Sequence, residues 1–424
     1  MRRRSFLAVS ALGLGLAGCL GRQRSLTPSA VPDCHPDCDT PNRSYIFADD
    51  SQLLTQRKRV IEGVEPFASA YDEFISVADS TFDDSLEAVT DDDGTDHGPH
   101  RFVADTNERA DYRAALRMSA AARNFGLAYH FTGDDAYARK VVDVLHHWFL
   151  GDDTYMIPDN SIPNANGAIR QHVWMPSFLY GASFVRGHRR WGRYDGSRPW
   201  DGGDSGDAES AFRQWVVDWH DTFRASEPDW CPTNNRWPWR IANKAAVAAY
   251  LDDDDLMTTA KQMYRAQTRT ECADGRTKGR PWADYTDVSP TQGYFEGEID
   301  RENSFQYTGY NLLAHAMCCV AFETWDGTDL WTFDAPGPSD PAPGPTLRKA
   351  LRWYAPYVRD VDAWEWNTVP VKDEDIEQAC TLYELAHTRW NAFDSVLEDP
   401  DRIDGRPYWD RRILGPITLT HGIP

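Results

Sequence analysis

Two short segments of the chain combine residue types that can neutralise a carboxylate and move a proton. Residues 234–239 read Asn-Asn-Arg-Trp-Pro-Trp, and residues 298–311 contain Arg301 and Tyr307. Arginine, amide groups and the N–H groups at a helix N-terminus all bind carboxylates. A tyrosine can donate a proton, or take and donate it when nearby cations make its phenol more acidic. This set suits β-elimination on a sugar that carries a carboxylate.

The reaction explains why these residue types are needed together. A 4-linked uronic acid carries a hydrogen on C5, next to its carboxylate, and this hydrogen is only weakly acidic. Donors that neutralise the carboxylate also stabilise the enediolate that develops when the C5 proton leaves. A base must take that proton, and an acid must protonate the leaving oxygen O4.

Both segments are expected at the start of a helix. Asn303 or Ser304 is a good N-cap, and a helix from there places Tyr307 and Asn311 opposite the apolar face. Pro238 suits the first turn of a second helix that runs to residue 251. Two plainer interpretations stay open, because an exposed tyrosine is often only a surface residue and an asparagine before a helix is often only a cap.

The apolar periodicity is helical almost throughout the chain, and good strand patterns are few. We predict an all-α fold, an (α/α) toroid or incomplete α/α barrel built of antiparallel helix pairs. A domain boundary at 341–345 is the alternative to one domain, but the helices on either side look alike. The expected helices cover 52–78, 106–131, 134–150, 172–190, 208–226, 237–251, 254–270, 303–325, 345–360 and 373–395.

Three sequence elements, in this order, resemble the alginate lyase family. Residues 127–134 resemble its helix-turn-helix stretch, and residues 148–158 resemble its Trp-Phe…Thr-x-Met-x-Pro element. Residues 293–301 resemble its Gly-x-x-x-x-Glu-x-x-Arg motif, which is followed by Tyr307 and by Tyr-Asn-Leu at 310–312. The resemblance spans about residues 105 to 360. It implies an α/α-barrel lyase that acts on a uronate polymer such as alginate.

The chain departs from the family pattern at Arg236. The resemblance implies the motif Asn-Asn-His at 234–236, and the family's histidine is taken as a partner in proton abstraction. Arginine cannot act as a base near neutral pH. Either Tyr307 performs both proton transfers, which we favour, or His172 supplies the base from another helix. A lone histidine at a helix start is more often structural. We predict catalytic roles for Tyr307, Arg301, Asn235 and His172, and substrate binding by Asn234, Arg236, Trp237, Trp239, Arg240, Tyr310 and Asn311.

Aromatic residues are abundant, with 17 tryptophans and 18 tyrosines. Many will belong to the core, but an indole also stacks on the apolar face of a pyranose. The tryptophans expected in loops or at helix starts are the candidate cleft-lining residues: Trp230, Trp237, Trp239 and Trp282.

The net charge of −22 argues against nucleic acid as a partner. Acid-rich surfaces keep proteins hydrated in brine, so we expect a halophilic source. The negative charge of the surface also repels a polyanionic sugar unless salt screens that charge. The Debye length is only ~3 Å near molar salt. We expect an anionic polysaccharide as substrate, a monomer, and no cofactor; Cys34 and Cys38 make at most half of a metal site.

The N-terminus reads as an export signal. Arg2, Arg3 and Arg4 precede a short apolar run, typical of a twin-arginine signal peptide over residues 1–18. Residues 16–19 resemble a lipobox, so Cys19 would carry a lipid anchor; an ordinary cleaved signal is the alternative. Residues 19–45 read as a polar tether and 46–424 as a single lyase-like domain. We therefore expect an exported protein that touches the membrane only through this anchor.

Two other functions remain open from the sequence. One is a glycoside hydrolase on a similar helical toroid that uses paired carboxylates, drawn from Asp284, Asp287, Glu296, Glu298 and Asp300. The other is a sugar-binding surface lipoprotein without catalysis. Acidic residues are so common in this chain that any one carboxylate pair is weak evidence.

Overall fold

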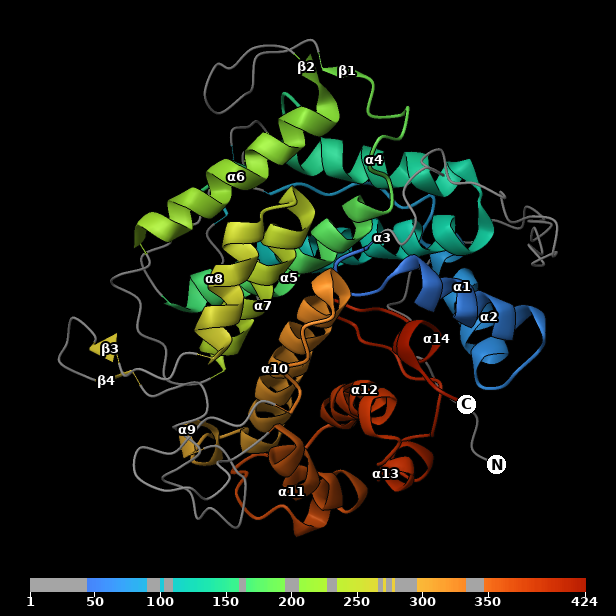
Figure 1. Cartoon of the computed structure of the whole chain (residues 1–424), viewed down its shortest axis with the longest axis vertical. Coiled ribbons are helices and arrows are strands. Elements are labelled where there is room, and N and C mark those ends of the chain that lie inside the picture. Colours follow the sequence, from blue (N-terminus) through green and yellow to red (C-terminus); the bar gives the residue numbers. More distant parts are fainter. Residues whose placement is uncertain are drawn as a thin grey trace.

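The fold is a curved array of α-helices, most of them packed on a neighbour in the chain, in the computed structural model (Figure 1). The structure describes residues 44–89, 100–102, 110–159, 165–194, 206–226, 235–265, 270–271, 277–278, 296–332 and 347–424. The predicted signal peptide and most of the predicted tether, with Cys19, Cys34 and Cys38, lie outside these residues. Within them, none of the helices combines the length and the apolarity that a membrane crossing requires.

Helices dominate the described residues, and strands are confined to two small antiparallel hairpins. Helices α1 to α7 span Asp50–Ile61, Phe67–Ser80, Ala110–Thr132, Asp135–Phe149, Ala165–Ser183, Ala208–Ser226 and Arg236–Leu251. Helices α8 to α14 span Asp254–Arg265, Glu296–Ile299, Ser304–Asp326, Leu347–Arg359, Asp373–Trp390, Asp394–Glu398 and Ile417–His421. β1 Arg193–Tyr194 pairs with β2 Gly206–Asp207, and β3 Thr270–Glu271 pairs with β4 Thr277–Lys278.

An inner row of long helices forms the core of the array. Helices α3, α5, α7, α10 and α12 pack in that order, each against the next. α7 and α10 are buried over nearly their whole length, whereas α8 and α11 bury only one face. The inner helices are therefore apolar around most of their circumference, and the outer helices are amphipathic. This arrangement confirms the predicted all-α toroid.

Small residues allow the inner helices to approach closely. A Cβ placed on Gly181 of α5 would lie 2.4 Å from the backbone of Ala122 on α3, and one on Gly126 would lie 2.9 Å from the carbonyl oxygen of Gly181. No side chain fits at these distances, so glycine is required where α3 crosses α5. The crossing fixes α5 and, next to it, α7, whose N-terminus carries Asn235 and Arg236.

The row closes on itself through the two ends of the described chain. α14 packs against α1, α2 and α12. Gln56 of α1 donates a hydrogen bond to the carbonyl oxygen of Gly422 at 2.8 Å, and His421 contacts the carbonyl oxygen of Phe47 at 2.8 Å. The array is thus a ring in space, as a toroid requires.

The structure differs from the sequence predictions in three places. The helix predicted over 52–78 is two helices, α1 and α2, because Gly63 adopts a positive φ of 69° between them. α5 begins earlier than predicted, so His172 lies within a helix instead of at its start. α10 is an inner helix, so Asn311 is buried and does not face outward.

Candidate active site

A buried carboxylate links the two segments that the sequence singles out. Glu298 of the short helix α9 is 0% exposed. Its Oε1 accepts hydrogen bonds from the backbone N and from Nδ2 of Asn235, at 2.6 and 2.9 Å, and one from Nδ2 of Asn311 at 3.2 Å. Its Oε2 lies 3.3 Å from Nη1 of Arg301. One carboxylate therefore holds side chains from the start of α7, from the loop before α10 and from α10 itself.

The electrostatics of Glu298 reflect opposing effects. Burial raises the pKa of its carboxyl to about 7, against the lowering influence of Arg301 and of the amides of Asn235 and Asn311. Burial disfavours the charged form because the carboxylate loses its water. The group therefore changes charge near neutral pH, in the middle of the site.

Tyr307 and Arg301 are in direct contact. The guanidinium carbon of Arg301 lies 3.5 Å from the centre of the Tyr307 ring, and both side chains are partly exposed. α10 begins at Ser304, where Asn367 caps it: the Asn367 Oδ1 accepts hydrogen bonds from Phe305 N at 2.8 Å and from Ser304 Oγ at 2.9 Å. The cap fixes the first turn, from which Tyr307 projects beneath Arg301.

Arg236 adds a second guanidinium to this place. Burial lowers the pKa of Arg236, followed by the charge of Arg301, while Glu298 and Tyr307 raise it. Arg170 of α5 also acts on it electrostatically. The structure thus brings Asn235, Arg236, Arg301 and Tyr307 into one site, although 65 positions separate Arg236 from Arg301.

Tyr310 lies one turn further along α10 and is mostly covered. The guanidinium carbon of Arg412 lies 4.5 Å from the centre of its ring, and the ring of Trp239 lies 4.5 Å away on centres. Burial raises the pKa of Tyr310 well above its usual range, although Arg412 opposes this. Tyr310 is therefore a neutral, packed residue beside Tyr307.

Of three predicted contact residues in the first turns of α7, two are placed differently from the expectation. Trp239 is 0% exposed and packs in the core, and Arg240 is 4% exposed. Burial of Arg240 lowers its pKa to about 9, and its guanidinium carbon lies 5.0 Å from the centre of the Trp237 ring. Trp239 and Arg240 follow Pro238 into the first turns of an inner helix, which turns their side chains into the protein. Of the three, Trp237 alone keeps partial exposure.

His172 lies deep between helices. It is 0% exposed, and the ring of Trp219 lies 6.4 Å from its own on centres. Burial lowers the pKa of His172 well below its ordinary value, and the charges of Arg240, His220 and Lys244 lower it further. The imidazole is therefore neutral, and it is shielded from solvent.

Two residues have places in the site that the sequence does not predict. Glu298 belongs to the Glu-x-x-Arg motif, a signal that points to a pairing with Arg301 but not to one with Asn235. Arg412 belongs to the C-terminal segment, more than 100 residues from Tyr310, and no motif marks it. Asn234, Trp230, Trp282, Asp284 and Asp287 lie outside the described residues.

The described residues offer no ready place for a metal ion. Among them, no group of three or more His, Cys, Asp or Glu side chains could hold one. Cys318 and Cys319 are buried free thiols in the core of α10, as their apolar context predicts.

The described fold finds its counterparts in solved structures of alginate lyases. An alginate lyase from Bacteroides ovatus shares 18% identity, with 91% of this chain and 100% of that chain covered and a TM-score of 0.64. Alginate lyase A1-III from Sphingomonas species A1 shares 16% identity over 92% and 100% of the two chains, with a TM-score of 0.57. A variant of A1-III complexed with a tetrasaccharide shares 16% identity over 92% and 99%, with a TM-score of 0.57.

Sequence comparison is more specific than the shared fold. No curated protein matches this sequence. A model of the alginate lyase family matches residues 64–364, which is well over half of the chain and includes Asn235, Glu298, Arg301 and Tyr307. The all-α toroid, the order of the motifs and this match agree: the chain belongs to the alginate lyase family and is a polysaccharide lyase.

Proposed function

We propose that the protein cleaves a 4-linked uronate polymer, of which alginate is the family's example, by β-elimination with Tyr307 as the proton-transfer group. One observation carries the proposal: the Arg301 guanidinium lies 3.5 Å from the Tyr307 ring and shares Glu298 with Asn235. Carboxylate-binding groups and a proton donor must act on one sugar ring, so they must share one site. That a relative was solved with a tetrasaccharide agrees with an oligosaccharide ligand.

In the proposed reaction, Asn235, Arg236 and Arg301 bind the uronate carboxylate and offset the negative charge of the enediolate. Tyr307, acting as a phenolate, takes the C5 proton. The electron pair of the C5–H bond forms the C4=C5 double bond while the C4–O4 bond breaks. The same tyrosine returns the proton to O4, so the products are an unsaturated uronate and a new chain end.

The choice of Tyr307 for both transfers rests on the other candidates' surroundings. Arg236 stays protonated near neutral pH, so it cannot accept a proton. His172 is 0% exposed, and the charges of Arg240, His220 and Lys244 act on it, so the side chain is buried away from solvent and from the exposed face of Tyr307. Tyr307 is partly exposed and lies beside two guanidinium groups. Their positive charge offsets the negative charge of the phenolate.

A hydrolase with paired carboxylates finds less support. Glu298 is engaged by four hydrogen-bond donors and is 0% exposed, so it does not reach a glycosidic bond. Asp300 is exposed, but buried Glu298 cannot serve as the second carboxylate of a catalytic pair with it. A non-catalytic binding protein would not need a proton donor such as Tyr307 beside the groups that bind the sugar carboxylate.

We also propose that the enzyme is exported by the signal over residues 1–18, anchored through a lipid on Cys19, and active in concentrated salt. The sequence pattern of the N-terminus and the net charge of −22 support this. Replacement of Cys19 by serine should release an otherwise surface-bound enzyme into the medium. A protein that stays on the cell surface after that change would exclude the lipid anchor.

The function is tested by incubating the mature protein, in high salt, with a panel of uronate polymers. A lyase gives an unsaturated product that absorbs in the ultraviolet. A hydrolase gives reducing ends without that absorbance, and a binding protein gives neither. The proposal requires ultraviolet absorbance and new reducing ends to appear together on at least one polymer.

A further inference from the structure

The buried carboxylate of Glu298 accepts four hydrogen bonds from its neighbours. The donors come from three separate parts of the site: Asn235 before α7, Arg301 before α10, and Asn311 within α10. All of them are groups that the proposed reaction uses, or neighbours of such groups. If Glu298 takes up a proton, one of its oxygens carries a hydrogen and becomes a donor among these donors.

The contacts also determine how two substrate-binding groups are oriented. Oε1 takes one N–H of the Asn235 amide, which leaves the second N–H free to point elsewhere. Oε2 holds the Arg301 guanidinium on one side while the Tyr307 ring holds it on the other, at 3.5 Å. A guanidinium held on two sides loses little freedom when a carboxylate binds.

We infer that Glu298 is a positioning residue, which sets Asn235 and Arg301 around the carboxylate of the sugar and does so only in its charged form. The inference rests on the proposed function. A carboxylic acid or an amide at this position carries a hydrogen-bond donor. In either orientation of the side chain, that donor faces a donor of Arg301 or of the two asparagines. At least one of the substrate-binding groups would then lose its partner and its orientation.

This inference connects the site to pH. Among the described residues, the charged groups that act on the Glu298 carboxylate are Arg301 and, from α7, Arg236, and the amides of Asn235 and Asn311 donate hydrogen bonds to it. Burial raises the pKa of this carboxyl to about 7. Turnover should therefore fall as the pH drops below about 7, where Glu298 takes up a proton.

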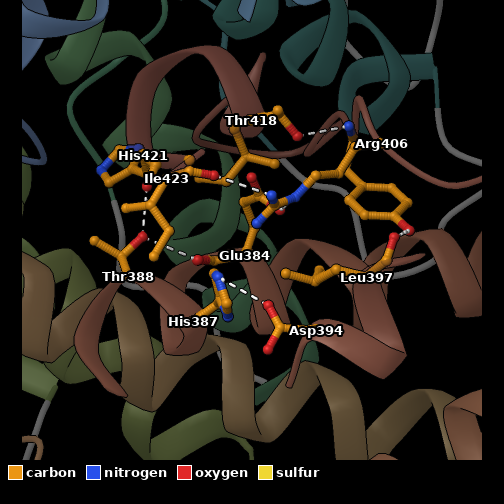
Figure 2. Close-up of polar contacts among 12 residues, drawn as sticks. Glu384, His387, Thr388, Asp394, Leu397, Arg406, Thr418, His421 and Ile423 are labelled. Atoms are coloured by element: carbon orange, nitrogen blue, oxygen red, sulfur yellow. Dashed lines mark hydrogen bonds and ion pairs between the residues drawn. The ribbon is translucent and has the colours of Figure 1, made fainter. Parts of the chain in front are cut away.

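A second buried glutamate offers a matched control. Glu384 of α12 is also 0% exposed, burial also raises its pKa to about 7, and it also pairs with an arginine, whose Nε donates to Glu384 Oε2 at 2.9 Å. Figure 2 shows this group with Arg406 and Thr418, beside the C-terminal residues His421 and Ile423. Its hydrogen-bond partners belong to the C-terminal segment and not to the site around Tyr307.

The experiment compares Glu298→Gln with Glu384→Gln and measures kcat, KM and the pH–rate profile on the polymer that the wild type cleaves best. We expect E298Q to lose about 100-fold, mainly in kcat, as misplaced groups do. The acidic limb of its profile near pH 7 should disappear. E384Q should keep both the rate and the limb. Glu298→Asp, which keeps the charge, should keep the limb and recover part of the rate.

Three outcomes would overturn the inference: an E298Q enzyme with wild-type turnover, an acidic limb that survives in E298Q, or the same loss of rate in both variants. If E298Q does not fold, the wild-type profile still decides, because constant turnover between pH 8 and pH 6 contradicts a positioning carboxylate of this kind. A wild type that forms no unsaturated product on any polymer defeats the proposed function instead, independently of Glu298.

Discussion

Replacement of Tyr307 by phenylalanine separates catalysis from folding. The ring would remain under the Arg301 guanidinium, 3.5 Å away, so the stacking contact and the start of α10 are kept. Within the described part of the chain the Tyr307 hydroxyl makes no hydrogen bond, and the side chain is partly exposed. The free energy of unfolding should therefore change by no more than ~0.5 kcal/mol. Loss of a proton-transfer group should lower turnover at least ~100-fold, which is ~2.7 kcal/mol of transition-state stabilisation.

The control is Tyr137→Phe on α4, which removes the same atom elsewhere. The Tyr137 hydroxyl donates to Asp79 at 2.6 Å, so its loss should cost about 1 kcal/mol of stability and no turnover. Initial rates come from ultraviolet absorbance of the unsaturated product, and stability comes from denaturant unfolding. The two variants should show opposite patterns. Near-normal turnover in Tyr307→Phe would remove Tyr307 from the mechanism.

Three further predictions address the base, the buried charge and the surface. His172→Ala should keep most of the turnover and the acidic limb of the profile; a loss as large as that of Tyr307→Phe, with folding preserved, would show that His172 is the base. For Glu384 the folded-state pKa of about 7 exceeds the ordinary value of 4.5, so the stability that its protonation contributes is complete below pH 4.5 and is lost as the pH rises through 7. Unfolding midpoints across this range should fall less steeply in Glu384→Gln than in the wild type, and equal slopes would contradict the shift. Because the net charge is −22, KM for an anionic polymer should fall between 0.1 and 1 M NaCl, as the Debye length shrinks from ~10 to ~3 Å; a KM that rises with salt would show that the site's arginines dominate.

The helices could be predicted from the sequence because their signals are local. Apolar periodicity and end signals place α6 over 208–226, as observed, and Pro238 marks the first turn of α7. The start of α5 could not be predicted in this way, because Ala-Asn-Gly at 165–167 has the composition of a loop. Such a stretch becomes helical when the packing of α5 against α3 and α7 outweighs local preference.

The candidate site could be predicted only in part, because its connections are not local. Tyr307, Arg301 and Asn235 stand in motifs with a recognisable chemistry. The role of Glu298 depends on a contact with Asn235 across 63 positions. In a chain this acidic, the sequence does not distinguish Glu298 from the other candidate carboxylates. Arg412 reaches Tyr310 only through the path of the C-terminal segment. Periodicity contains no information about such contacts.

The ring closure of the fold has a consequence for engineering the chain. His421 and the backbone of Phe47 are within hydrogen-bond distance, so a short linker could join residue 424 to residue 44. New ends could open at the exposed turn between α1 and α2, where a Cβ added to Gly63 would meet no atom within 4 Å. Helix α1 would then become the last helix of a circular permutant. Helix α1 has 12 residues and is about 18 Å long at 1.5 Å per residue. An anchor attached to the new end would therefore join the enzyme about 18 Å from the present start of α1.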